Sequence, residues 1–125
     1  MNLLHFELSE FDSPDEIGSG KTMDSNFLSM LDDARGIAGI PFTITSGFRT
    51  PAHNAKVGGV SPSNNSKGSS HMYGYAADIA APDSRTKFII IDSLLKAGFN
   101  RIGVGKTFIH CDNDPDKSPD VIWTY

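Results

Sequence analysis

The sequence lacks the features that mark several large protein classes. It contains a single cysteine, Cys111, so no intrachain disulfide can form and a cysteine-rich zinc finger is excluded. The longest apolar run, Phe88 to Ile91, is far too short to cross a membrane. The first residues, Met1 to Glu7, contain neither a basic segment nor a long apolar stretch. No signal peptide is therefore indicated, and we expect synthesis in the cytoplasm.

Positive charge is also in short supply. Lys and Arg number 11 against 15 Asp and Glu, which gives a net charge of -4. We therefore expect no nucleic-acid partner and no membrane partner, because both attract basic surfaces. The length of 125 residues indicates one domain, 1–125, in which residues 1–22 form an N-terminal arm and loop. We expect this domain to be a monomer.

Acidic residues are missing from one long internal stretch, from Phe42 to Ala77. The same stretch contains the basic residues Arg49, Lys56 and Lys67. A locally basic segment favours a small anionic ligand such as a carboxylate. A chance gap in a short chain would give the same pattern, so the gap alone does not identify a ligand.

The distribution of apolar residues predicts an α+β domain with a small, mostly antiparallel sheet and two main helices. The predicted helices cover residues 23–38 and 85–97, with a short one at 52–57. The predicted strands cover residues 42–45, 75–81, 101–104, 107–112 and 121–124. In the second main helix we expect a buried face made of Phe88, Ile91, Leu94 and Leu95.

Two segments between these elements fit more than one structure. Residues 3–11 alternate loosely, as in an edge strand or an extended arm. Residues 58–70 are rich in Gly, Ser and Asn, which fits either a mobile flap over a groove or a plain connection.

Two short stretches concentrate residue types that bind zinc. His71 and Asp78 lie seven residues apart, and His110 lies on a later predicted strand. Zinc accepts nitrogen from His and oxygen from Asp, and catalytic sites use three protein ligands. The helical H-E-x-x-H pair is absent, which excludes a thermolysin-like site. Taken singly, each residue also fits an ordinary role, such as a packed histidine or an aspartate that caps a turn.

Alternation along the predicted strand 107–112 separates its residues into two faces. Phe108, His110 and Asp112 share one face, and Cys111 lies on the other. Cys111 is therefore predicted to be a core thiol rather than a metal ligand. Asp112 can serve beside His110 as a general base or as the group that orients a histidine ring.

Other polar residues are weaker candidates. Arg49 lies where a predicted strand meets the short helix, with Thr50 suited to cap that helix. Its side chain is expected either to point into a cleft or to form a salt bridge. His5 and His53 are possible ligands by residue type alone. We expect His5 in the N-terminal arm and His53 on the exposed face of the short helix.

In combination, three motifs resemble a known family. The pattern S-x-H-x-x-G-x-A-x-D is matched by residues 69–78, S-G-[FY]-R-[ST]-P by residues 46–51, and F-[IV]-H-x-D by residues 108–112. These motifs resemble those of the zinc D-Ala-D-Ala carboxypeptidases and related peptidoglycan endopeptidases (peptidase family M fifteen). Those enzymes share the Hedgehog/DD-peptidase fold, and the resemblance covers about residues 6–125.

The resemblance implies a specific site and activity. It implies zinc (Zn2+) held by His71, Asp78 and His110, and substrate contacts from Arg49 and Ser69. The implied reaction is hydrolysis of an amide bond next to a D-amino acid in peptidoglycan stem peptides or cross-links.

The general base is where this sequence departs from the family pattern. Many members have an acidic residue three positions before the last histidine ligand, and here that position is Thr107. Threonine cannot act as the base, so Asp112 is the best candidate on the strand-face argument. Asp114 is a weaker candidate, further along a predicted turn.

The short chain is similar to phage and prophage members of the family, which often act as endolysins or wall-processing enzymes. An enzyme of this kind would act on the cell wall after release from the cytoplasm. The alternative is a non-catalytic zinc-binding module of the same fold with a binding or assembly role, which Thr107 favours. A second alternative is a zinc amidohydrolase that acts on another small peptide.

Overall fold

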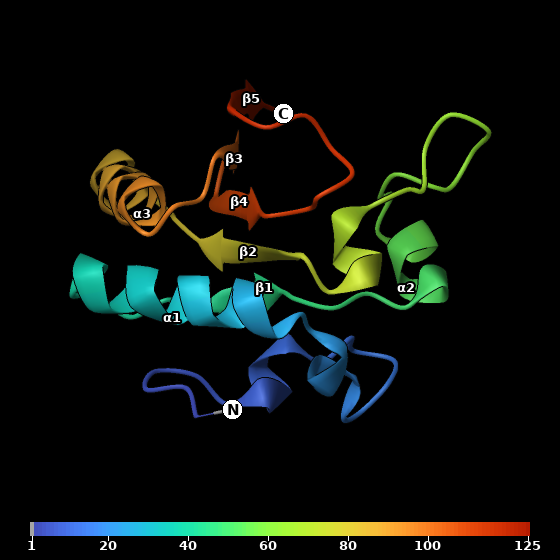
Figure 1. Ribbon diagram of the computed structural model, residues 1–125, viewed down its shortest axis with the longest axis horizontal. Coiled ribbons are helices and arrows are strands. Elements are labelled where there is room, and N and C mark those ends of the chain that lie inside the picture. Colours follow the sequence, from blue (N-terminus) through green and yellow to red (C-terminus); the bar gives the residue numbers. More distant parts are fainter. Residues whose placement is uncertain (1) are drawn as a thin grey trace.

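The structure, a computed structural model, describes residues 2–125 (Figure 1). Met1, which belongs to the predicted arm and to the 1–125 domain, lies outside the described residues. The helices are α1 (Ser25–Ala38), α2 (Pro51–Lys56) and α3 (Ser84–Lys96). The strands are β1 (Ile44–Ser46), β2 (Ala76–Ala80), β3 (Arg101–Val104), β4 (Phe108–Asp112) and β5 (Val121–Thr124). Short 3-10 helices lie at Leu8–Phe11, Ser19–Thr22 and Ser70–Tyr73.

The five strands form one mixed sheet in the order β1-β2-β4-β3-β5. The pairs β1–β2, β2–β4 and β4–β3 are antiparallel, whereas β3 and β5 are parallel. The α+β class is confirmed, but the parallel edge is a feature that the sequence did not indicate. It arises because residues 113–120 carry the chain from β4 past β3, so that β5 lies on the outer side of β3 and parallel to it.

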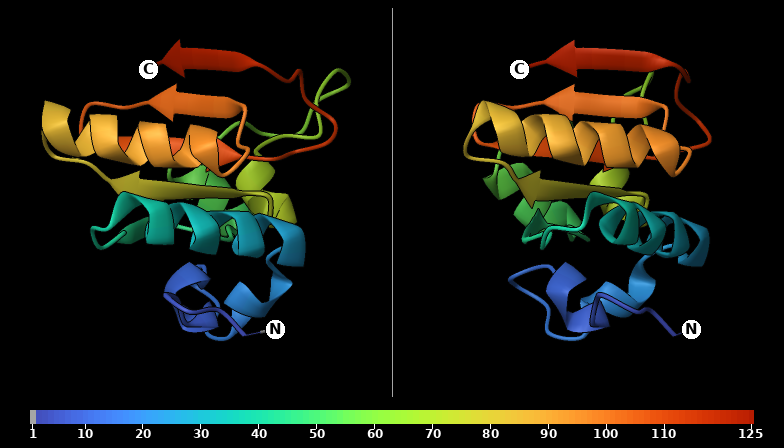
Figure 2. Two further views of the ribbon diagram at one scale, coloured as in Figure 1. Left: turned by 60° about the vertical axis from the view of Figure 1, so that its left-hand side comes forward. Right: turned by 90° about the vertical axis from the view of Figure 1, so that its left-hand side faces the viewer.

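Both long helices cover the same face of the sheet, as Figure 2 shows. Between helices and sheet lies the core, which includes Phe27 and Leu31 from α1, Ile90 and Leu94 from α3, and Ile109 from β4. Complete burial of such a side chain is worth about 1.5–3 kcal/mol. The opposite face of the sheet is left for polar side chains. No helix within residues 2–125 combines the length and apolar character required to span a bilayer.

The predicted buried face of α3 was partly wrong. Phe88 is 71% exposed and Leu95 is 47% exposed, whereas Ile90 and Leu94 are fully buried. Residues 88–91 are apolar all around the helix, so periodicity did not select the buried side. The actual face is set by Ile90 and Leu94, which lie one turn apart.

Residues 3–11 form an arm and not an edge strand. Their backbone turns into the 3-10 helix Leu8–Phe11, and the sheet ends at β1. The arm is held by Asp32 of α1, whose carboxylate accepts hydrogen bonds of 2.9 Å from the backbone N–H groups of Leu4 and His5.

Candidate metal centre

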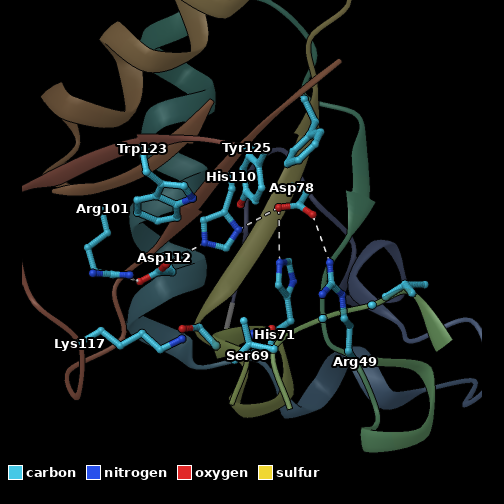
Figure 3. Close-up of a pocket in the computed structure, with 16 residues that line it drawn as sticks. Arg49, Ser69, His71, Asp78, Arg101, His110, Asp112, Lys117, Trp123 and Tyr125 are labelled. Atoms are coloured by element: carbon cyan, nitrogen blue, oxygen red, sulfur yellow. Dashed lines mark hydrogen bonds and ion pairs between the residues drawn. The ribbon is translucent and has the colours of Figure 1, made fainter. Parts of the chain in front are cut away.

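Three buried side chains converge on the sheet face that the long helices leave free (Figure 3). His71, Asp78 and His110 each offer one donor atom, and these atoms all lie within 4.8 Å of one another. Asp78 on β2 and His110 on β4 are direct partners in the sheet register. His71 comes from the 3-10 helix Ser70–Tyr73, just before β2. The structure thus brings together all three predicted ligands.

The turn that presents His71 explains two motif positions. Ser69 caps the 3-10 helix, because its Oγ accepts a hydrogen bond from the His71 backbone N–H. Gly74 ends the helix with a φ of 78°, a left-handed conformation that favours glycine. A Cβ atom at Gly74 would lie 2.7 Å from the carbonyl oxygen of Thr22. Both residues therefore hold His71 in place beside β2.

Both histidine rings are oriented by hydrogen bonds on the side away from Asp78. His71 Nδ1 donates to the Gly47 carbonyl oxygen at 2.8 Å, and His110 Nε2 donates to Asp112 Oδ2 at 2.7 Å. The other ring nitrogens face Asp78 Oδ1, at 3.4 Å for His71 and 2.9 Å for His110. Metal-binding histidines typically have this arrangement, in which one nitrogen is fixed by an acceptor and the other binds the ion. Two imidazoles and one carboxylate also fit the donor preference of zinc.

The protonation states of His71 and Asp78 suit a cation site, whereas His110 would have to release a proton to bind an ion. Burial lowers the pKa of His71, which favours its neutral form. Burial would raise the pKa of Asp78, but the hydrogen bond from His110 and the neighbouring His71 hold that pKa well below its usual range. Burial would lower the pKa of His110, but its hydrogen bonds to Asp112 and Asp78 raise it overall. Asp78 is therefore an ionised carboxylate, the form in which it can bind a metal.

Asp112 is engaged through both carboxylate oxygens. Oδ2 accepts the hydrogen bond from His110, and Oδ1 accepts one of 2.6 Å from Arg101 Nε. Burial would raise the pKa of Asp112, but the bonds from His110 and Arg101 lower it overall. These contacts support the orienting role for Asp112. Its role as a general base stays a prediction.

Arg49 also contacts the carboxylate of Asp78. Its Nη2 atom lies 3.3 Å from Asp78 Oδ2, its Nε donates to Ser46 Oγ, and its Nη1 donates to Asn54 Oδ1. Arg49 thus forms a partly buried salt bridge and also lines the cavity above the cluster. Ser69 lines this cavity too. Their substrate contacts stay a prediction.

The cavity has a volume of about 490 Å³. Besides the predicted site residues, its walls include Phe108, Arg101, Lys117, Trp123, Tyr125 and residues 57–60. Phe108 was predicted on the face of His110 and residues 58–70 as a possible flap, whereas Arg101, Lys117, Trp123 and Tyr125 were not predicted at the site. Alternation applied to residues 101–104 and 121–124 would have placed Arg101 and Trp123 on the face of His110. Lys117 lies in a loop, where no periodicity was available.

One row of residues crosses four strands of the sheet and builds the floor of this cavity. The register pairs Asp78 with His110, His110 with Gly103, and Gly103 with Trp123. A Cβ atom at Gly103 would lie 2.9 Å from the Trp123 ring. The missing side chain allows the indole to pack 5.4 Å from the His110 ring, centroid to centroid, and 5.1 Å from Arg101 Cζ.

Three residues considered in the sequence analysis lie outside this cluster. Thr107 is exposed and is not among the cavity residues. His5 is exposed on the arm, and His53 is half-buried on α2. Within residues 2–125, the metal-type cluster consists of His71, Asp78 and His110 without them.

Asp114 has a structural role beside the cavity. Its carboxylate accepts hydrogen bonds of 2.7 Å from Lys67 Nζ and from Ser70 Oγ. Lys67 also pairs with Asp116 at 2.8 Å. These contacts tie the end of the 58–70 segment to the loop that follows β4.

Comparison with known proteins identifies the family. The model of the family described as Peptidase M15 matches residues 5–112. No curated protein matches the chain. The matched region contains the cluster of His71, Asp78 and His110 together with Arg49 and Ser69. Because the match extends over most of the sequence, the chain belongs to the Peptidase M15 family.

Proposed function

We propose that this protein is a zinc-dependent metallopeptidase that hydrolyses an amide bond next to a D-amino acid in peptidoglycan stem peptides or cross-links. The observation that carries the proposal is the buried cluster of His71, Asp78 and His110 at an open cavity, in a chain of the Peptidase M15 family. The donor set and the fixed orientation of both rings support zinc as the ion.

In this proposal the cluster holds the ion and the surrounding residues support it. Zinc, when bound, lowers the pKa of a water molecule and polarises the scissile carbonyl. The Gly47 carbonyl and the Asp112 carboxylate keep the rings of His71 and His110 in their binding orientation. Arg49, which already contacts Asp78, extends this support to the third ligand.

Substrate binding is assigned to Arg49 and Ser69. Both line the cavity, and an arginine can offer paired N–H donors to a carboxylate or carbonyl group. Asp112 remains the proposed general base, although its contacts with His110 and Arg101 give stronger support to its orienting role. The proposed place of action is the cell wall, which the protein would reach after release from the cytoplasm.

The direct test is mass spectrometry of purified bacterial peptidoglycan after incubation with zinc-loaded protein. The His110→Ala variant serves as the control because it lacks a ligand. New termini in the wild-type digest alone would support the proposal, and their masses would identify the bond. An unchanged digest from protein that holds one zinc would overturn it.

A second candidate is a non-catalytic zinc module of the same fold. The acidic residues that line the cavity are Asp78 and Asp112, and both are already paired with cations or histidines. Thr107, where many family members have an acid, is exposed outside the cavity. One equivalent of bound zinc without hydrolysis of any wall peptide would support this candidate.

A further inference from the structure

The charged side chains of the cavity form pairs, with one exception. Arg49 pairs with Asp78 at 3.3 Å, and Arg101 pairs with Asp112 at 2.6 Å. Lys117 lines the same cavity but has no ion-pair partner within residues 2–125. The cavity therefore contains one cation that forms no ion pair with the described residues.

The two acids whose charges act on Lys117 are bound to other groups. Asp112 binds Arg101 and His110, and Asp114 binds Lys67 and Ser70 through its two carboxylate oxygens. Neither carboxylate lies within ion-pair distance of the Lys117 ammonium group. An anion from outside would give this ammonium group a partner of its own.

The charges around Lys117 also favour an anionic partner from outside the protein. Burial lowers the pKa of Lys117, and the charges of Arg101 and Lys67 act in the same direction, while Asp114 and Asp112 oppose them. A partly buried ammonium is stabilised by a negative partner, because it has lost part of its hydration. A carboxylate that enters the cavity would supply this partner.

The position of Lys117 is set by an ordered turn. The Lys117 backbone N–H donates to the Asp114 carbonyl at 3.3 Å, and Asp114 Oδ1 accepts a hydrogen bond of 3.0 Å from the Asp116 backbone N–H. Lys67 bridges Asp114 and Asp116. In the view of Figure 3 the Lys117 side chain enters from the side of Asp112, and Arg49 lies on the other side of His71.

We propose that Lys117 binds a substrate carboxylate at a subsite separate from Arg49, and thereby selects stem peptides that have an acidic group near the scissile bond. The identity of the peptide rests on the proposed function. Lys117 lies beyond the residues matched by the family model, so the match assigns it no role. In a stem peptide the carboxylate can come from a D-glutamate linked through its side chain or from the C-terminal residue.

Three matched peptides show whether Lys117 binds the D-glutamate carboxylate or the C-terminal carboxylate. One peptide contains D-glutamate and a free C-terminus, a second has the D-glutamate carboxylate replaced by an amide, and a third has an amidated C-terminus. Hydrolysis is measured as kcat/KM, and equilibrium binding is measured with ketomethylene analogues that cannot be cut. The proteins are zinc-loaded wild type, Lys117→Met, Lys117→Arg and the control Lys21→Met, an exposed lysine outside the cavity.

We expect wild type and Lys21→Met to bind the all-acid peptide about tenfold more tightly than one of the amides, because a charge-assisted contact is lost in that amide. The amide whose loss of affinity disappears in Lys117→Met identifies the carboxylate that Lys117 binds, because a carboxylate bound by Arg49 keeps its effect in that variant. Lys117→Met should abolish the difference, and Lys117→Arg should retain most of it. Each comparison is a ratio of two peptides on one protein sample, so partial misfolding of a variant does not affect it.

Different results would overturn the proposed peptidase function and the proposed Lys117 subsite. If the peptides are cut but Lys117→Met keeps the wild-type preference, the Lys117 subsite is wrong and the peptidase function stands. If no peptide is cut but the preference in binding depends on Lys117, the subsite stands and the peptidase function is wrong. Equal binding of all three peptides to the wild type would also overturn the subsite.

Discussion

Asp78 and His110 face each other across β2 and β4, and Asp78 Oδ1 lies 2.9 Å from His110 Nδ1. Two of the three candidate ligands are thus neighbours in the interior of a sheet. Sites built on strands are held more accurately than sites built on loops. Only His71 depends on a turn, and that turn is closed by Ser69 and Gly74.

The first prediction concerns metal binding. His110→Ala removes one of three ligands, so we expect it to lose stoichiometric zinc and all hydrolytic activity. Zinc content after dialysis, measured by elemental mass spectrometry, checks this. His53→Ala serves as the control because His53 lies outside the cluster. Wild-type zinc affinity in His110→Ala would refute the assignment of the site.

The second prediction separates the two roles of Asp112. Asp112→Ala should still bind one zinc but with an affinity about 10–100-fold lower, because His110 loses the acceptor that orients its ring. Most turnover should be lost as well. Zinc titration and peptide hydrolysis measure the two effects separately, with Asp33→Ala, an exposed aspartate of α1 outside the cavity, as the control.

A different result would refute each of the two roles of Asp112. Full activity in Asp112→Ala would show that the base assignment is wrong. Unchanged zinc affinity would show that the hydrogen bond from His110 to Asp112 does not strengthen zinc binding by His110.

Much of the fold followed from local patterns. Residues 101–104 and 121–124 were predicted as strands and are β3 and β5 with the same bounds. Asp83 caps α3 and Gly39 ends α1, and both features depend on neighbouring residues alone. Strand alternation correctly placed Cys111 in the core, away from His110.

What the sequence did not indicate depends on contacts between distant segments. The parallel pairing of β3 and β5 is set by the path of residues 113–120. The Arg101–Asp112 pair requires the register of β3 against β4. Lys117 reaches the cavity only because Asp114 is anchored by Lys67 and Ser70. No local pattern contains such information.

The third prediction concerns pH. Burial would raise the pKa of Asp114, but hydrogen bonds from Lys67 and Ser70 lower it below its ordinary value of 3.8. A lowered folded-state pKa means that Asp114 stabilises the fold at pH values above 3.8, and that this contribution is lost as the pH falls through the folded pKa. Asp114→Asn should therefore show a flatter dependence of stability on pH in this acidic range.

Urea unfolding of metal-free protein at a series of pH values between about 3 and 7 measures this effect. At neutral pH we expect Asp114→Asn to be less stable by about 1–3 kcal/mol, because the Lys67 ammonium loses its buried anionic acceptor. The control is Asp120→Asn, because Asp120 is exposed in the loop before β5. Parallel pH curves for wild type and Asp114→Asn would contradict the prediction.

The last prediction uses Trp123, the only tryptophan of the sequence. A methyl group introduced by Gly103→Ala would lie 2.9 Å from the indole and would push it away from His110. We expect a loss of about 1–3 kcal/mol in the free energy of unfolding from overpacking. Tryptophan emission should shift to longer wavelength, and zinc affinity should fall several-fold.

The matched control for this prediction is Gly36→Ala. Gly36 lies on α1, and its added carbon would lie 3.5 Å from His5 Nε2, which is an ordinary contact distance. That change should raise helix stability by about 0.5–1 kcal/mol and leave the emission of Trp123 unchanged. An identical response of both variants would show that the close approach at Gly103 does not position the indole beside the candidate metal site.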